Sequence, residues 1–441
     1  MNETKESKIV LDKNDLSSQR LELAKQIQES VRRYFSLEDP LRNHTSHKIP
    51  LHAASYGAEE VNEVIDSLLS TQVTMGEKVK KFESLWAEYL GVRNAIMVNS
   101  GSSANLIAAS VLSNPEFPNR IEPGDEVIVP AIAWSTTYYP LVNIGAVPVF
   151  VDVEMETFTI DVEAAERAIS PRTRAIVPVH LLGNPCDMKG LLDLANRHNL
   201  FVLEDACEAH GAQFNGKKVG SLGHIGSFSF YFSHHISTVE GGMVVTSDDR
   251  IADLARILRA HGWQRDVRKK IKQTNSLIDE RFLFINLGYN LRPMEFQGAF
   301  GIHQIKKIED FIQRRRENAQ YWNSALSKHS DWLSFCRGRE TCDSRSVWFG
   351  YPITIKTTAP FSREELVRFL ANKGVETRPI MAGNFCEQPA IHLFPHKVSG
   401  PLKNADFIMR RSFFVGNYPG LNKSDLSYLV TCVDEFMEQW I

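Results

Sequence analysis

The stretch AIVPVHLLGNPCDMKGLLDLANRHNLFVLED, from Ala175 to Asp205, decides the fold class. Its two ends, Ala175–Val179 and Phe201–Leu203, are short apolar runs of strand length. Between them, four apolar residues recur at the spacing i, i+3, i+4, i+7: Met188, Leu191, Leu192 and Ala195. That spacing predicts an amphipathic helix. A strand, a helix and a strand in succession indicate a parallel sheet covered by helices.

The same alternation extends outward on both sides of this stretch. Further strand-length runs are Ala95–Val98, Glu126–Pro130, Val147–Val153, Gly226–Phe232 and Met243–Thr246. Helical patterns separate most of them. The sequence therefore predicts an α/β fold with a mainly parallel seven-stranded sheet. Ligands of such sheets bind beyond the carboxyl ends of the strands, so chemistry is expected there.

Two further regions flank this predicted large domain, which we assign to residues 51–330. Residues 1–50 form a polar arm with one predicted helix, since Leu23, Ile27 and Val31 recur at helical spacing. Residues 331–441 are predicted to form a smaller C-terminal α/β domain. Its elements are strands at Trp348–Ile355 and Val375–Ile380, a helix opened by a Ser362/Glu365 capping box, and a last helix from Ser424.

Composition excludes several classes of protein. The chain has 441 residues, 43% apolar and 23% charged, with a formal net charge of -3, so nothing favours nucleic acid as a partner. Arg314, Arg315 and Arg316 are expected on a solvated helix face. The six cysteines include no C-x-x-C pair. The N-terminus lacks a signal-peptide core, and no apolar run is long enough for a membrane helix, so we expect a cytoplasmic protein with no membrane partner.

Unusual residues follow the predicted strands. The turn Asn99–Asn105 (NSGSSAN) opens a helix, and it is either a plain N-cap or an anion cradle made of amides and hydroxyls. Trp134 follows another strand and is either a core residue or a flat platform. Asp205, with Glu204 before it and Glu208 after it, lies at a strand end where a carboxylate can hold a proton on a heterocycle nitrogen.

The stretch SFSFYFSHHISTVEGG, Ser227–Gly242, adds a pair of histidines, His234 and His235. Neighbouring strand residues point to opposite faces, so both should not enter one site if the strand runs that far. The chain has no lysine between Lys218 and Lys269. An anion cradle, an aromatic platform, a carboxylate and a reactive side chain are together what pyridoxal phosphate requires.

From about Leu51 to the C-terminus, the chain resembles the family of sugar aminotransferases that use pyridoxal phosphate on nucleotide-linked keto-sugars. The resemblance is carried, in order, by the motifs TMGEKVKKFE, NSGSSAN, VPAIAW, PVHLLGNPCDM, LEDACEAHGA, FSFYFSHHISTVEGG and NLGYNLRPMEFQGAFG. It implies the pyridoxal-phosphate fold type I and a homodimer.

The resemblance also implies roles for individual residues. The implied cofactor-binding residues are Gly101, Ser102 and Ser229 at the phosphate, Trp134 stacked on the ring, Asp205 at the ring nitrogen, Glu208 near the ring, and Asn290 at the phosphate of the partner's cofactor. The family's covalently bound lysine is replaced here by His234.

That replacement is similar to the sugar 3-dehydratases of the family, which use non-covalent pyridoxamine phosphate and remove the 3-hydroxyl of a 4-keto sugar. The resemblance implies that His234 is the catalytic base, and His261, in RAHGWQRD, is a second candidate for proton transfer. No cysteine lies between His261 and Asn290, so we expect no iron–sulfur cluster and no metal. The motifs resemble the iron-independent type, which acts on a GDP-linked sugar and regenerates its cofactor with L-glutamate.

Alternatives stay open at this point. One is an aminotransferase-like protein acting on a CDP- or dTDP-linked sugar. Another is a non-catalytic binding homologue that lost the lysine. A third is a metal-dependent enzyme that uses His234, Glu208 and His210, although it would leave the anion cradle unexplained.

Overall fold

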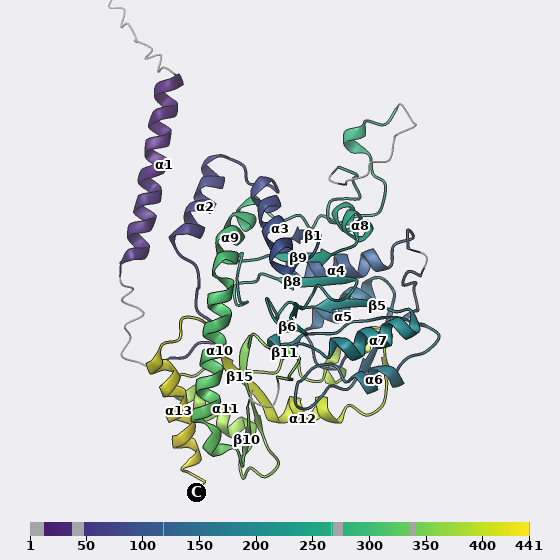
Figure 1. Ribbon diagram of the computed structural model, residues 1–441, viewed down its shortest axis with the longest axis vertical. Helices are drawn as coiled ribbons and strands as arrows, with labels where there is room; N and C mark the ends of the chain where they lie inside the picture. The colour runs from purple at the N-terminus through teal and green to yellow at the C-terminus, as the bar shows by residue number, and fades with distance from the viewer. Residues whose placement is uncertain are drawn as a thin grey trace, which may run out of the picture.

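The computed structural model describes residues 13–37, 48–117, 119–265, 267, 277–335 and 340–440. Its main sheet has eight strands in the order β1-β9-β8-β5-β4-β2-β3-β14 (Figure 1). Their bounds are β1 Asn94–Val98, β2 Glu126–Pro130, β3 Val147–Val151, β4 Thr173–Ile176, β5 Phe201–Asp205, β8 Ile225–Ser229, β9 Gly242–Thr246 and β14 Lys397–Val398.

The sheet is mainly parallel, as predicted. All pairs from β8 through β14 are parallel, and β9 runs antiparallel to both β8 and β1. The seven predicted strands are all present. The two-residue β14 extends the sheet by pairing with β3, and it is too short to show any periodicity in the sequence.

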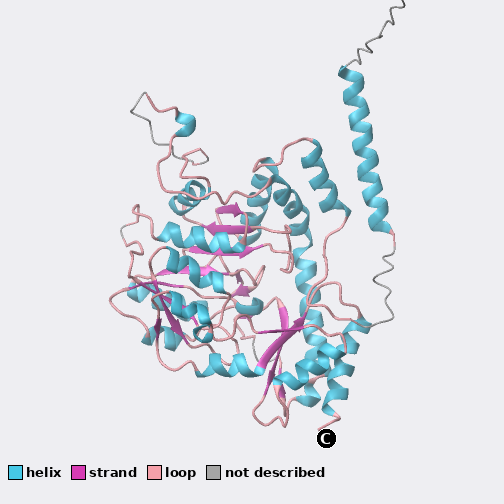
Figure 2. Cartoon of the chain, turned by 180° about the vertical axis from the view of Figure 1, so that it is seen from behind, coloured by secondary structure: helices cyan, strands magenta, loops and turns pink. Residues whose placement is uncertain are grey.

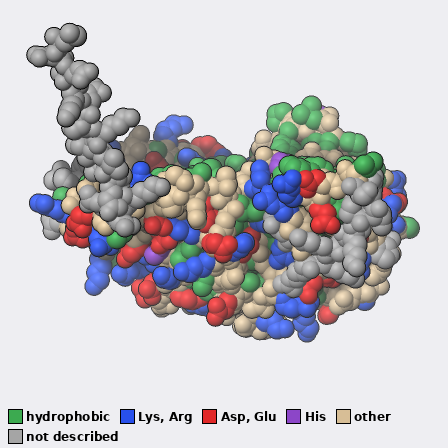
Figure 3. Space-filling view, turned by 90° about the horizontal axis from the view of Figure 1, so that it is seen from above, with side chains coloured by type: hydrophobic (Ala, Val, Ile, Leu, Met, Phe, Trp, Pro, Cys, Tyr) green, Lys and Arg blue, Asp and Glu red, His purple; other side chains and the backbone are tan. Residues whose placement is uncertain are grey.

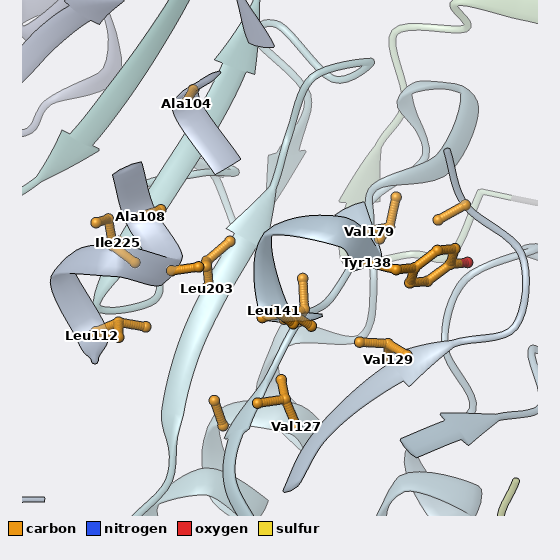
Figure 4. Close-up of a cluster of buried hydrophobic side chains, with 14 of the residues drawn as sticks. Ala104, Ala108, Leu112, Val127, Val129, Tyr138, Leu141, Val179, Leu203 and Ile225 are labelled. Atoms are coloured by element: carbon orange, nitrogen blue, oxygen red, sulfur yellow. The ribbon is translucent and has the colours of Figure 1, made fainter. Parts of the chain in front are cut away.

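Helices cover both faces of this sheet. Alternate strand residues point to opposite sides, and apolar residues lie on both sides. Val127 and Val129 of β2 pack in one buried cluster, while Ile128 packs in another. The first cluster joins the strands to α4 (Gly101–Leu112), α5 (Ser135–Asn143) and α8 (Asp249–Arg259), and Figure 4 shows side chains of α4 and α5 within it. The second joins them to α3 (Glu77–Leu90), α6 (Val162–Arg167), α7 (Met188–His198) and α9 (Glu295–Gln304).

A second sheet of four strands, β10-β12-β15-β13, lies beside the C-terminal helices (Figures 1 and 2). Its strands are β10 Leu333–Ser334, β12 Gly350–Ile355, β13 Thr377–Pro379 and β15 Ser412–Gly416, and the helices are α11 Arg363–Asn372, α12 Lys403–Arg411 and α13 Lys423–Met437. The predicted capping box is confirmed, since Ser362 N donates to Glu365 Oε2 at 2.7 Å and Glu365 N donates to Ser362 Oγ at 3.2 Å.

Helix α10 (Ile308–Ala325) connects the two regions, and its Trp322 belongs to a third buried cluster together with Ile49. The domain boundaries at residues 50 and 330 stay predictions, because this cluster takes residues from both sides of each. A third sheet consists of the short strands β11 (Ser344–Arg345), β6 (Gln213–Phe214) and β7 (Lys217–Lys218).

The predicted helix of the N-terminal arm is α1 (Lys13–Ser36), which contacts α2 (Ala58–Leu69). Residues 1–12 and 38–47 of the arm lie outside the described residues. None of the helices described is long and apolar enough to cross a membrane. Lys/Arg and Asp/Glu side chains are interspersed on the face in Figure 3, which shows no basic stripe there.

Candidate active site

The strand topology brings four of the predicted site segments to one edge of the main sheet. β1, β8, β5 and β2 all run in the same direction, so their carboxyl ends lie together. Asp205 is the last residue of β5, and Ser229 is the last residue of β8. Gly101 begins α4 shortly after β1, and Trp134 precedes α5 shortly after β2.

Gly101 and Ser229 lie in contact across this edge. A Cβ atom added to Gly101 would lie 2.4 Å from Ser229 Cβ, so only glycine fits there. Ser100 caps α4 by accepting a hydrogen bond from Ser103 N at 3.1 Å, and Ser102 Oγ donates to Thr136 Oγ1 at 2.9 Å. The turn is therefore a true N-cap, and it also presents the first amides of α4, which have no acceptor within a helix, beside two serine hydroxyls.

Asp205 is buried and firmly oriented. Its Oδ2 accepts hydrogen bonds from Asn105 Nδ2 at 2.9 Å and from Thr137 Oγ1 at 2.7 Å, and its Oδ1 accepts one from Cys207 N at 3.2 Å. Neutral donors from α4, α5 and the following loop thus hold the carboxylate without cancelling its charge. The arrangement suits a carboxylate that stabilises a proton on a ligand nitrogen.

Glu204 and Glu208 make different contacts from those of Asp205. Glu204 points to the other face of the strand, where its oxygens accept from Gly220 N at 2.7 Å and Leu222 N at 2.7 Å, so it fixes a loop. Glu208 Oε2 accepts from Leu182 N at 2.8 Å. Burial, with a smaller contribution from the charge of Asp205, raises the pKa of Glu208 to about 8.

Trp134 is 60% exposed at the start of α5, which argues against the core interpretation. The next turn of the same helix supplies Thr136 and Thr137, which bond to Ser102 and Asp205. The indole therefore lies at the site with much of its surface uncovered, as a stacking platform requires.

The structure shows that the strand argument does not apply to the two histidines. β8 ends at Ser229, five residues before His234, so the alternation of strand faces does not reach the pair. Both rings lie near His210, with centroids at 5.8 Å for His234 and 5.4 Å for His235. Exposure distinguishes them instead, since His235 is fully buried with Nε2 3.3 Å from Val347 O, while His234 is half-buried.

The surroundings of His234 are basic and apolar. Burial first, then the charges of Arg315 and His52, lower the pKa of His234 to about 3, so its imidazole is neutral and can accept a proton. His234 Nδ1 is buried and has no hydrogen-bond partner among the residues the structure describes.

Arg315 was missed from the sequence, where it was expected on a solvated face. It is 1% exposed, and that prediction is wrong for this residue, although Arg314 is exposed and pairs with Glu317 at 3.5 Å. Its position in the buried stripe of α10, seven residues after Ile308, was the available signal.

His261 and Asn290 lie together in another segment. His261 N donates to Tyr289 O at 2.7 Å, and its ring packs on Trp263 with centroids 4.8 Å apart. Asn290 is exposed and accepts a hydrogen bond from Arg292 Nε at 3.1 Å. These contacts do not bring either residue to Asp205 or His234 of the same chain, and their predicted roles remain predictions.

The metal alternative gains no support from this geometry. Within the described parts of the chain, no three His, Cys, Asp or Glu side chains are grouped as ligands for an ion. By contrast, the glycine-tight contact of Gly101 with Ser229, the helix amides and the neutrally bonded Asp205 fit the phosphate and the ring nitrogen of a pyridoxal-type cofactor.

The match to known proteins covers most of the chain. Residues 54–434 match the DegT/DnrJ/EryC1/StrS aminotransferase family, and the chain belongs to that family. This confirms the resemblance that its motifs carry.

A GDP-4-keto-6-deoxy-D-mannose 3-dehydratase of Yersinia pseudotuberculosis is 40% identical over 374 residues, which are 84% of this chain and 94% of that protein. The solved E. coli GDP-4-keto-6-deoxy-D-mannose-3-dehydratase with bound hydrated PLP has a TM-score of 0.83 at 37% identity, covering 88% of this chain and 99% of that one. A structure of GDP-4-keto-6-deoxymannose-3-dehydratase with a trapped PLP-glutamate geminal diamine matches equally, covering 87% and 100%. These likenesses confirm the predicted pyridoxal-phosphate fold type I.

Proposed function

We propose that the chain is a 3-dehydratase of a nucleotide-linked 4-keto-6-deoxy sugar, namely GDP-4-keto-6-deoxymannose. It uses pyridoxal or pyridoxamine 5'-phosphate, bound non-covalently, and L-glutamate regenerates the amine form. One observation carries the proposal: a neutral, half-buried histidine, His234, stands where the resemblance to the family expects a lysine, in a site whose Gly101, Ser229 and Asp205 fit a cofactor phosphate and ring nitrogen. A binding homologue without catalysis has no need of this combination.

The chain's residues would divide the work as follows. Gly101, Ser102 and Ser229 would hold the cofactor phosphate, Trp134 would cover the ring, and Asp205 would stabilise the proton on the ring nitrogen. When bound, pyridoxamine phosphate supplies the amine that condenses with the sugar's 4-keto group and the ring that accepts electrons.

His234 would remove a proton from the cofactor's methylene carbon while the 3-hydroxyl of the sugar leaves. Because an imidazole forms no stable covalent bond with the cofactor, His234 would not compete with the amine of glutamate for the aldehyde carbon of the pyridoxal form. Glu208, whose pKa is raised to about 8, follows Asp205 by three residues and would lie near the ring.

We further propose an iron-independent homodimer in which Asn290 reaches the partner's cofactor. Its exposure, together with that of Leu287 at 85% in the same loop, suits a surface covered by a second copy.

The test is to assay purified protein with GDP-, CDP- and dTDP-linked 4-keto-6-deoxy sugars, each with cofactor and glutamate. We expect a 3-deoxy product and ammonia from the GDP-linked sugar. An amino sugar would favour an aminotransferase instead, and loss of activity on iron removal would refute the iron-independent assignment.

Variants of the two histidines sharpen the test. His234→Ala should lower dehydration about 100- to 10,000-fold, the usual effect of losing a positioned base, yet keep cofactor binding. His234→Lys should create a protein–cofactor bond reducible by borohydride at position 234, absent from the wild type. His235→Ala is the matched control and should keep more activity. A dead His235→Ala beside a normal His234→Ala would reverse the assignment.

A further inference from the structure

The segment Ser346–Phe349, here called the strap, joins distant parts of the site. Its backbone bonds to the loop after β4, since Val347 N donates to Gly183 O at 3.0 Å and Phe349 N donates to Leu182 O at 2.9 Å. Leu182 N in turn donates to Glu208 Oε2. The strap therefore links the loop that contacts Glu208 to the loop of the two histidines.

The strap also contacts both histidines directly. Val347 O lies 3.3 Å from His235 Nε2, and the ring of Phe349 packs against that of His234 with centroids 5.2 Å apart. The position of the strap thus limits where the imidazole of His234 can lie.

Arg315 of α10 holds the strap in place by a hydrogen bond. Its Nη1 donates to Phe349 O at 2.9 Å and also to Asn417 O. The side chain of Asn417 completes the frame, since its Nδ2 donates to Arg315 O at 3.1 Å and to Trp348 O at 3.0 Å. Arg315 is therefore hydrogen-bonded to Phe349, the residue that packs on His234.

The charge of Arg315 is not neutralised locally. Its acceptors are backbone carbonyls, and across the described parts of the chain no carboxylate forms an ion pair with it. Its Nε is buried without a partner there as well. A buried cation without a counter-charge acts strongly on its neighbours, because little water screens it.

The titratable and charged groups that face His234 come from several elements: His52 before α2, His210 after β5, Tyr231 and His235 in its own loop, and Arg315 from α10. None of these groups is acidic at neutral pH. Burial lowers the pKa of His52 to about 4 and the pKa values of His210 and His235 well below the usual value, so these rings carry little charge at neutral pH. Burial and the charge of Arg315 therefore oppose protonation of the imidazole.

We infer that Arg315 is a positioning residue for His234, which fixes the strap against the imidazole and whose positive charge adds to burial in disfavouring a proton on that imidazole. The inference rests on the proposed function only for the role of His234 as the base. The contacts of Arg315 with the strap and the effect of its charge on His234 do not depend on that function.

The experiment uses holoenzyme with cofactor bound and compares Arg315→Gln, Arg315→Lys and Arg314→Gln. Glutamine keeps a donor for Phe349 O but removes the charge, lysine keeps the charge but loses the fork of donors, and exposed Arg314 is the control. Two quantities are measured: the pH dependence of kcat, and the titration of the His234 imidazole by NMR of labelled histidine.

We expect Arg315→Gln to raise the titration midpoint of His234, and the acidic limb of the kcat profile, by about one pH unit, a usual size for one nearby charge. Arg315→Lys should leave both midpoints unmoved and lower kcat at all pH values. Arg314→Gln should match the wild type. If Arg315→Gln lowered kcat equally at every pH with no change in the His234 titration, the residue would be merely structural and the inference wrong.

Two measurements cover other outcomes. If Arg315→Gln fails to fold, the wild-type titration alone decides, since a His234 that titrates near its ordinary pKa of about 6.5 overturns the inference. If His234→Ala retains dehydration while the Arg315→Gln titration shift is seen, the proposed role of the base fails and the effect of Arg315 on the imidazole stands.

Discussion

Asp205→Asn tests which property of the carboxylate holds the cofactor. In the wild type, Oδ2 accepts from Asn105 Nδ2 and Thr137 Oγ1, and Oδ1 accepts from Cys207 N. Both oxygens thus face donors. An asparagine amide has one NH2 group, so whichever way it turns, that group faces a donor.

The cost follows from this geometry. A buried donor that faces another donor and has no acceptor lowers the free energy of unfolding by about 1–3 kcal/mol. The midpoint of thermal unfolding of the cofactor-free protein should fall accordingly. The loss of a charged acceptor at the ring nitrogen should raise the Kd for pyridoxal phosphate by about 10- to 150-fold, the equivalent of 1.5–3 kcal/mol. Cofactor absorbance titration measures the second effect, and calorimetry measures the first.

The swap Asn105→Asp with Asp205→Asn separates the two effects. Asn at 205 can then donate to Asp at 105, whose other oxygen accepts from Ser227 Oγ, which bonds to Asn105 Oδ1 in the wild type. Asn105 Nδ2 also donates to Thr136 O at 3.2 Å in the wild type, and Asp at 105 cannot make that bond, so we expect the unfolding midpoint to recover only in part. The Kd should stay raised, because the charge has moved away from the ring. A swap variant that binds the cofactor as tightly as the wild type would refute the role given to the charge of Asp205.

Three further predictions concern the cradle, a titration and the dimer. Gly101→Ala should lower the free energy of unfolding by about 1–3 kcal/mol and, by displacing Ser229, raise the Kd for the cofactor, since its Cβ would meet Ser229 Cβ at 2.4 Å, whereas Gly57→Ala, with 3.7 Å to its nearest atom, should do neither. Because the pKa of Glu208 is raised to about 8, the native state holds its proton longer than the unfolded chain, so stability should fall as pH rises from about 4.5 to 8. Urea unfolding of Glu208→Gln should lack that step, which is worth at most about 5 kcal/mol. Asn290→Ala should weaken cofactor retention, and full activity of a monomer at assay concentration would contradict the shared site.

The sequence predicted the sheet well because its strands are short apolar runs flanked by helical spacing. It also placed Gly101, Asp205 and Ser229 at one edge, since the parallel order alone brings carboxyl ends together. Contacts between segments that lie far apart in the chain could not be predicted from the sequence. The strap lies more than a hundred residues after His234, and no local sequence pattern predicts the contact between the two.

One argument did not apply and one prediction was wrong, each for a definite physical reason. The alternation of strand faces held only if the strand reached His234 and His235, and β8 ends at Ser229. Arg315 was assigned to solvent because charged residues are seldom buried, yet backbone carbonyls of Phe349 and Asn417 satisfy part of its guanidinium.

The two buried charges of the site act on different protons. Asp205 carries a negative charge held by neutral donors, so it favours a proton on the atom that it faces. Arg315 carries a positive charge without a paired carboxylate among the described residues, so it disfavours a proton on His234. In the proposed reaction, the base must be unprotonated before each turnover and the ring nitrogen must be protonated, so the two positions require electrostatic fields of opposite sign. A lysine at position 234 would have to lose its own charge beside Arg315 and bind the cofactor, whereas an imidazole is neutral there from the start. The histidine and the buried arginine are therefore best understood as one arrangement, in which removing the arginine's charge should cost activity at low pH first.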